Sequence, residues 1–198
     1  MRFICIKQHD ITDCGAACLA TICKQNGYKI GITKIREIAG TDKAGTNAYG
    51  IIKAAEQLGF NAKGVKGNRD AFFSGFPLPC IAHVIVDGSL LHYVVIHKIT
   101  KKQVIIADPA KGILKLSPEK FFGEIHEEGK PPKYQWSGVL ILLTKKDTFV
   151  KGDETKGLFS RFFYLLKPQK KLLLHIFTAS LVYTILGILG AFLVLEYK

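Results

Sequence analysis

Cys14 is the residue of this sequence best suited to covalent chemistry. It follows Thr12 and Asp13, either of which is a suitable helix cap. A cysteine in the first turn of a helix lies near unpaired backbone N–H groups and the positive end of the helix dipole, which favour its thiolate. Gly15 and two alanines follow, and such small residues would let another chain approach the sulfur. We take Cys14 as a candidate nucleophile, and the other cysteines as small buried apolar side chains: Cys5, Cys18, Cys23 and Cys80.

A nucleophilic thiolate needs a base that holds its proton and later protonates the leaving group. Three of the six histidines lie in the predicted sheet: His83, His92 and His97. His92 opens a predicted strand and is expected near its exposed end, whereas His97 lies five residues later and is expected on the opposite face, pointing to solvent. Each of the three could equally be a structural histidine.

Asp108 is the candidate carboxylate that would hydrogen-bond the imidazole and fix its orientation. It ends the predicted strand 103–107, which a Lys-Lys turn joins to the strand 90–99. Residues whose numbers sum to about 200 then face each other across the hairpin, so His92 is expected opposite Asp108 within about two residues. An Asp before Pro is also a common way to open a turn.

Gln8, six residues before Cys14, could share an oxyanion hole with the backbone N–H of Cys14.

The elements that must position these residues change character midway. The first half predicts helices at 14–25, 33–39 and 47–58. The second half predicts a short helix at 117–122 and strands at 80–86, 90–99, 103–107, 112–116 and 137–143. Helices followed by an antiparallel meander predict an α+β fold with N-terminal helices packed on an antiparallel sheet.

A long apolar run closes the sequence. Leu172–Leu195 contains 24 residues without a charge, and at ~1.5 Å per residue this run is long enough to cross a bilayer. Lysines just before it predict that everything upstream lies in the cytosol. Gly157–Leu166 has the pattern of a segment lying at the membrane interface.

We therefore expect three parts, with a soluble domain at 1–145, a linker and interfacial segment at 146–171, and a transmembrane helix at 172–195. The predicted localisation is the cell membrane, with the soluble domain on the cytoplasmic side.

Composition narrows the choice of partners and cofactors. Lys and Arg total 28 against 16 Asp and Glu, a net charge of +12. Arginine is scarce and no recognition motif occurs, so we expect no nucleic-acid partner. An excess of lysine suits anionic lipid or an acidic peptide. Five cysteines without a C-x-x-C pair or a signal peptide favour free thiols in a reducing compartment, with no metal site and no cofactor.

Four motifs together carry a family resemblance: QHDITDCGAACLA at 8–20, GTNAYG at 45–50, LLHYVVI at 90–96 and ADPAKG at 107–112. They make residues 3–145 resemble the N-terminal peptidase domain of peptidase-containing ABC transporters, the bacteriocin-processing, double-glycine leader peptidases. The resemblance implies a papain-like cysteine peptidase fold.

The resemblance also implies roles for individual residues. Gln8, Cys14, His92 and Asp108 each match a motif position, so the resemblance implies that they are catalytic, and it points to Tyr49 in substrate binding. It implies cleavage after a Gly-Gly or Gly-Ala pair at the end of a precursor's leader peptide, followed by export.

The sequence departs from such transporters in one respect. No G-x-x-x-x-G-K-[ST] motif occurs; the nearest run, Gly59–Lys66, breaks the pattern, and its Gly64 is expected in a turn. ATP binding is therefore expected from remaining transporter subunits or domains. The main alternative function is a non-catalytic leader-docking domain of an exporter. A transglutaminase-like enzyme with a Cys-His-Asp site and a basic nucleic-acid binder are weaker alternatives.

Overall fold

Three helices form the N-terminal half of the fold: α1 (Cys14–Gln25), α2 (Ile32–Ala39) and α3 (Ala48–Gln57). The structure is a computed structural model that describes residues 3–43, 45–155, 157 and 166–196, the last seven as backbone only. All residues of α1 except the last two are buried, since this helix packs along the sheet. The Asn47 side chain caps α3, accepting a hydrogen bond from the Gly50 N–H at 2.7 Å. These helices match the predictions within one residue at each end.

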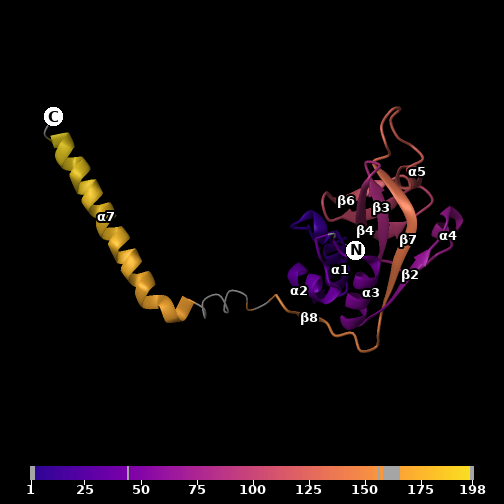
Figure 1. Ribbon diagram of the computed structural model, residues 1–198, viewed down its shortest axis with the longest axis horizontal. Helices are drawn as coiled ribbons and strands as arrows, with labels where there is room; N and C mark the ends of the chain where they lie inside the picture. The colour runs from indigo at the N-terminus through magenta and orange to yellow at the C-terminus, as the bar shows by residue number, and fades with distance from the viewer. Residues whose placement is uncertain (1–2, 44, 156, 158–165, 197–198) are drawn as a thin grey trace. The chain divides into compact units, whose positions relative to one another are not determined.

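An antiparallel six-stranded sheet in the order β2-β7-β3-β4-β5-β6 makes up the other half (Figure 1). Its strands are β2 (Phe60–Lys66), β3 (Cys80–Val86), β4 (Leu90–Ile99), β5 (Val104–Asp108), β6 (Gly112–Leu116) and β7 (Tyr134–Lys145). Both faces are covered. Leu19, Ile22 and Ile51 of the helices pack with Ile81 and Val95 on one face.

The second face of the sheet carries an aromatic cluster. Phe72 from α4 (Arg69–Phe73) and Phe121 from α5 (Pro118–Phe122) pack there with Trp136 of β7. Because helices and loops cover both faces, the strand ends at the sheet's edge are the places left for a functional cleft.

One strand of the sheet was not predicted from the sequence. Residues 60–66 form β2, an edge strand paired with β7. The expectation that Gly64 lies in a turn is wrong, because it lies in the middle of this strand opposite Ile141. The strand is hard to recognise from sequence because three of its seven side chains are Lys or Asn and a glycine interrupts them.

The chain forms two compact units, residues 1–155 and 156–198. Residues 146–155, assigned above to the linker, are part of the first unit. Phe149 packs on Phe60 with ring centroids 4.8 Å apart, and the short strand β8 (Gly152–Asp153) pairs in parallel with β1 (Tyr28–Lys29).

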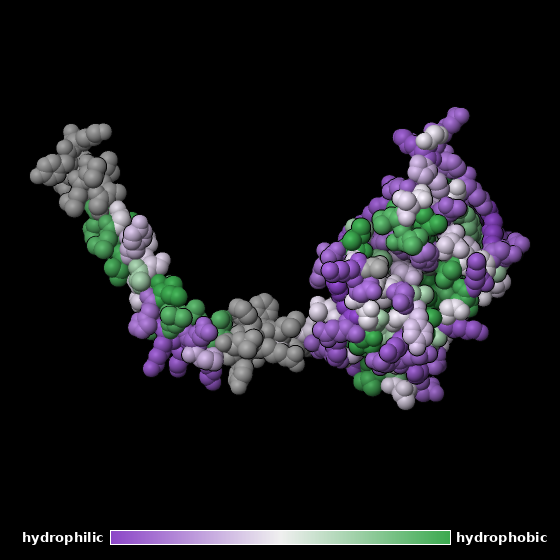
Figure 2. Space-filling model, viewed as in Figure 1, coloured by the Kyte–Doolittle hydropathy of each residue, from purple (hydrophilic) through white to green (hydrophobic). Residues whose placement is uncertain are grey.

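The second unit contains α7 (Lys170–Glu196), which follows a short 3-10 turn at Lys167–Gln169. Within the described part of the chain, one helical stretch, Lys167–Leu189, is long and apolar enough to cross a membrane. Its described side chains are exposed, and many of them are hydrophobic (Figure 2). The predicted interfacial segment Gly157–Leu166 lies almost wholly outside the described residues.

Candidate active site

Cys14 is the first residue of α1 and is 7% exposed. Asp13 occupies the N-cap position, but its side chain makes no capping bond. Its carboxylate instead accepts hydrogen bonds from Arg36 Nη1 at 2.6 Å and from the Asp10 N–H at 3.2 Å. An ion pair with α2 and a local turn therefore fix the start of α1, and with it the position of the sulfur.

The small residues after Cys14 serve packing within the domain. A Cβ on Gly15 would come within 2.8 Å of Ile51 Cδ1 and 3.1 Å of Thr46 Cβ, so the side chains of α3 and the preceding loop already fill that space. The expectation that these residues leave room for another chain is therefore wrong. Access to the sulfur must come from the N-terminal end of the helix.

His92 and Asp108 lie side by side, as the hairpin register predicted. Val95 of β4 pairs with Ala107 of β5, which puts the observed register two residues from the expected one. His92 Nε2 lies 3.0 Å from Asp108 Oδ1, and both side chains are buried. Since Nε2 faces the carboxylate, the other ring nitrogen is left for Cys14.

Asp108 has a full set of hydrogen-bond donors. Oδ2 accepts from the Tyr134 hydroxyl at 2.5 Å, and Oδ1 accepts from the backbone N–H groups of Ala110 at 2.7 Å and Lys111 at 3.3 Å. Burial alone would raise its pKa, but the hydrogen bonds from His92 and Tyr134 hold the pKa of Asp108 well below its usual range. Asp108 is therefore a carboxylate at neutral pH.

This carboxylate in turn affects the imidazole. Burial by itself would lower the pKa of His92, but hydrogen bonds to Asp108 and Cys14 and their charges outweigh it and raise the pKa to about 9. A protonated imidazole beside a sulfur and a carboxylate is the charge arrangement that stabilises a thiolate. The group can therefore hold a nucleophile and return a proton.

The other two candidate histidines lie elsewhere. His83 Nδ1 is 2.8 Å from Ser137 Oγ, a partner on β7. The expectation that His97 points to solvent is wrong. His97 is buried, with Nε2 2.8 Å from the Ile4 carbonyl oxygen and its ring stacked on Phe3, because the N-terminal residues cover that part of β4.

Gln8 lies at the edge of the same site. Its backbone N–H donates to the Pro109 carbonyl oxygen at 3.1 Å, which ties the N-terminal segment to the end of β5. Its side-chain Oε1 is buried, and it has no hydrogen-bond partner among the described residues. Gln8, His92 and Asp108 line one cavity of about 330 Å³, together with the apolar side chains of Ile11 and Leu90.

Comparison with known proteins identifies the domain. The model of the Peptidase C39 family matches residues 2–148. The chain belongs to this family. It is 38% identical over 185 residues to the lactococcin-G-processing and transport ATP-binding protein LagD of Lactococcus lactis, a match that covers 93% of this chain and 25% of LagD. The mesentericin-Y105 transport/processing protein MesD of Leuconostoc mesenteroides is 34% identical over 188 residues, again with 94% of this chain and 25% of MesD covered. The C39 chain thus spans about a quarter of the length of these relatives.

Solved structures agree with the assignment. The peptidase domain of Streptococcus ComA, a bi-functional ABC transporter, superposes with a TM-score of 0.64 at 32% identity, covering 73% of this chain and 100% of that one. A double glycine motif protease from an AMS/PCAT transporter, solved in complex with the leader peptide, superposes with a TM-score of 0.61 at 26% identity. The match covers 73% of this chain and 93% of that one. The α+β, papain-like cysteine peptidase fold predicted from the sequence is confirmed.

The remaining cysteines of the C39 domain are free thiols. Cys18, Cys23 and Cys80 are buried, and burial raises the pKa of each, for Cys23 to about 12. Cys5 is partly exposed, and its Sγ lies 3.4 Å from the Asp108 carbonyl oxygen; burial also raises its pKa. These four thiols are therefore poor nucleophiles.

Two other residues differ from what sequence predicted. Tyr134 was not among the candidates, although it donates the shortest hydrogen bond to Asp108. It opens β7, whose predicted strand began at residue 137. Its backbone pairs with Val86 of β3, and its hydroxyl reaches Asp108 although β3 and β4 lie between β7 and β5. Tyr49 is 75% exposed at the start of α3 and does not line the cavity that holds Gln8 and His92. Its role in substrate binding stays a prediction.

Proposed function

We propose that this C39 domain cleaves precursor peptides after a Gly-Gly or Gly-Ala pair at the end of their leader. Cys14 is the nucleophile, His92 the base and acid, Asp108 the group that orients the imidazole, and Gln8 an oxyanion donor. The observation that carries the proposal is the buried His92–Asp108 contact at 3.0 Å, with His92 also hydrogen-bonded to Cys14 at the start of α1.

The reaction proceeds in two steps. The Cys14 thiolate attacks the carbonyl carbon of the second residue of the pair, and the oxyanion is stabilised by the Gln8 amide and the backbone N–H of Cys14. The Gln8 terminal amide would need its NH₂ group toward the oxyanion, which a half-turn about the last side-chain bond supplies. The protonated His92 gives its proton to the leaving amine. Water, activated by His92, then hydrolyses the thioester and releases the leader with a free carboxyl terminus.

The substrate class follows from chemistry and from the relatives. Because Cys14 is buried, its sulfur is accessible only to a peptide backbone that comes close, and glycine has no Cβ to prevent this approach. LagD and MesD are by their names processing proteins of lactococcin G and mesentericin Y105. The AMS/PCAT protease was solved with a leader peptide bound. Both observations support a leader-bearing precursor as the substrate.

We also propose the division of the chain into a peptidase domain at 1–145, a connecting segment at 146–171 and a membrane helix at 172–195. The relatives are transport ATP-binding proteins, and α7 has the length and the apolar surface to cross a bilayer. Lysines 167, 170 and 171 before the helix favour a cytoplasmic peptidase domain. Export and ATP binding would come from the remaining parts of the transporter.

Replacing Cys14 by Ala in the full chain, solubilised in detergent, tests the proposal. We expect no cleavage of a Gly-Gly precursor, whereas Cys23→Ala, the same change at the other end of α1, keeps the rate within a few-fold. Mass spectrometry of the products locates the cut. Undiminished cleavage by the Cys14→Ala chain would contradict the proposal. Tight precursor binding without cleavage by the unmodified chain would favour the leader-docking alternative.

A further inference from the structure

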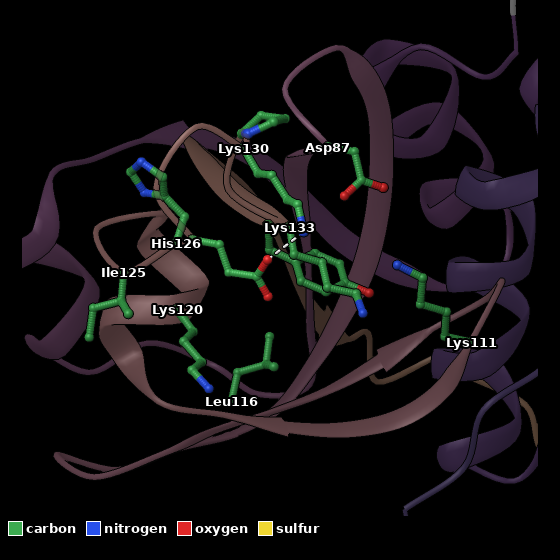
Figure 3. A pocket seen from close by; sticks show the side chains of 11 residues that line it. Asp87, Lys111, Leu116, Lys120, Ile125, His126, Lys130 and Lys133 are labelled. Atoms are coloured by element: carbon green, nitrogen blue, oxygen red, sulfur yellow. Dashed lines mark hydrogen bonds and ion pairs between the residues drawn. The ribbon is translucent and has the colours of Figure 1, made fainter.

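A second, larger cavity of about 740 Å³ lies beside the active site. Four lysines surround it: Lys111, Lys120, Lys130 and Lys133 (Figure 3). Asp87 and Glu127 are the two carboxylates in its lining, which leaves an excess of two positive charges without counting His126. The lysines come from the turn after β5, from α5 and from the loop before β7, so the fold gathers them from separate segments.

The lysines differ in whether their ammonium groups already have a partner within the domain. Lys130 Nζ forms an ion pair with Glu127 Oε2 at 2.6 Å. Lys111 Nζ lies 4.8 Å from the centroid of the Tyr134 ring. Neither Lys120 nor Lys133 has an ion-pair partner among the residues that the structure describes, and both are exposed. Those two ammonium groups are therefore available to a ligand.

The cavity is linked to the catalytic group by two residues. Lys111 lines both this cavity and the smaller one that holds Gln8 and His92. Tyr134 forms part of the wall here and donates its hydroxyl hydrogen bond to Asp108 at 2.5 Å. A peptide bound in the smaller cavity could therefore continue into the larger one.

The direction of the peptide follows from the proton transfer. His92 must protonate the leaving amine, so the imidazole faces the part of the substrate after the cut. The smaller cavity has His92 and Asp108 in its lining, so it receives the residues that follow the Gly-Gly pair. The lysine-lined cavity then lies further along the same side.

We propose that the lysine-lined cavity binds acidic side chains in the segment of the precursor that follows the cut. This inference rests on the proposed peptidase function and adds a second specificity element to it. The occupant is an acidic peptide segment because the cavity is lysine-lined and shares Lys111 with the smaller cavity, where the leaving segment must lie. Exposed Lys–carboxylate pairs are weak singly, so two of them change the specificity constant by about 3–10-fold.

The test uses the full chain with matched precursors that differ only after the Gly-Gly pair, one with Asp or Glu and one with Asn or Gln. We expect the unmodified chain to favour the acidic precursor by about 3–10-fold in kcat/KM at low salt and to lose this preference at high salt. The double variant Lys120→Ala/Lys133→Ala should remove the preference. Lys63→Ala/Lys66→Ala on β2, whose exposed lysines line neither cavity, should keep it. An unchanged preference in the first variant, or a preference set by residues ahead of the cut, overturns the inference.

A binding measurement keeps this inference separable from the proposed function. Uncut precursor is titrated into the Cys14→Ala chain, with and without the Lys120 and Lys133 changes. Tighter binding of the acidic precursor that depends on these lysines supports the inference, and equal binding of both precursors overturns it. Failure of the unmodified chain to cleave any Gly-Gly precursor would count against the peptidase function alone.

Discussion

The two sides of the active site differ in how completely their polar groups are bonded. On the sheet side, Asp108 accepts hydrogen bonds from His92, Tyr134 and two backbone N–H groups. On the N-terminal side, Gln8 is held only through its backbone, and its buried Oε1 has no partner among the described residues. The polar groups of the sheet side are all paired in the resting protein, while the N-terminal side has a buried polar atom without a partner among the described residues.

This difference separates stability from catalysis. A saturated buried carboxylate contributes to folding, and breaking its bonds leaves an uncompensated buried charge. An unpartnered buried amide oxygen makes no stabilising hydrogen bond in the resting protein, where it carries the cost of its lost hydration, and it becomes useful only when a ligand supplies the partner. We therefore expect changes on the sheet side to alter both stability and rate, and changes at Gln8 to alter the rate alone.

Gln8→Ala should have the largest effect on rate relative to its effect on folding. Loss of one oxyanion donor lowers kcat by about 10²–10³-fold with little change in KM. The free energy of unfolding should not fall, because no side-chain hydrogen bond is lost and a buried unpartnered oxygen is removed. Steady-state kinetics and urea unfolding measure the two quantities. Gln57→Ala, at the exposed end of α3, is the control, and a large loss of stability in Gln8→Ala would remove the contrast between the two sides.

Asp108→Asn should change the pH dependence. The raised pKa of His92, about 9, predicts that kcat/KM declines on the alkaline side near pH 9. Removing the carboxylate charge leaves burial to lower that pKa, so the decline should move to lower pH. The free energy of unfolding should also fall at alkaline pH. The contribution of a protonated His92 to stability is complete below its ordinary pKa, about 6.5, and is lost as the pH rises through about 9.

A pH–rate profile and unfolding at pH 6 and pH 9.5 test this prediction. If kcat/KM of Asp108→Asn still declines near pH 9, the carboxylate does not set the charge of the imidazole and the prediction is wrong. Asp70→Asn, the same change at an exposed residue of α4, is the matched control.

Tyr134→Phe should have the smallest effect on rate and a clear effect on stability. It removes the 2.5 Å hydrogen bond to Asp108 inside the domain and keeps the ring. Hydrogen bonds to charged groups contribute about 1.5–3 kcal/mol, so the free energy of unfolding should fall by about that amount at neutral pH.

The pKa of Asp108, which the Tyr134 hydrogen bond helps to lower, should rise in Tyr134→Phe. Its stabilising contribution, present above the ordinary Asp pKa and lost as the pH falls through the folded value, should then disappear at a higher pH than in the unmodified chain. Chemical denaturation from pH 7 to pH 3 measures both effects, and a variant as stable as the parent at pH 7 would contradict them.

Local pattern was enough to predict the elements that carry the catalytic group. The alternation along 90–99 and 103–107, with a two-lysine turn between them, gave the hairpin and the His92–Asp108 contact. Thr12 and Asp13, two residue types common at helix N-caps, followed by small and apolar residues, predicted the start of α1 at Cys14. Both predictions depend on residues close together in the sequence, where turn length fixes the register.

The features that sequence missed depend on distant segments. Tyr134 reaches Asp108 through tertiary packing, since β3 and β4 lie between its strand β7 and β5 in the sheet. Gly15 is small because Ile51 fills the space beside it, and His97 is buried because Phe3 stacks on it. In each case the partner lies more than 25 residues away, and no local periodicity reports such a contact.

The covalent intermediate tests the central claim most directly. The full chain is mixed with a Gly-Gly precursor whose scissile amide is replaced by an ester, quenched in acid within the first turnover and digested for mass spectrometry. We expect the leader, ending in Gly-Gly, as a thioester on Cys14, located within its fragment by tandem mass spectrometry, with Cys5, Cys18, Cys23 and Cys80 unmodified. A leader adduct on another cysteine, or release of the leader with no adduct under conditions where Gln8→Ala and Cys14→Ala are equally active, would contradict the account.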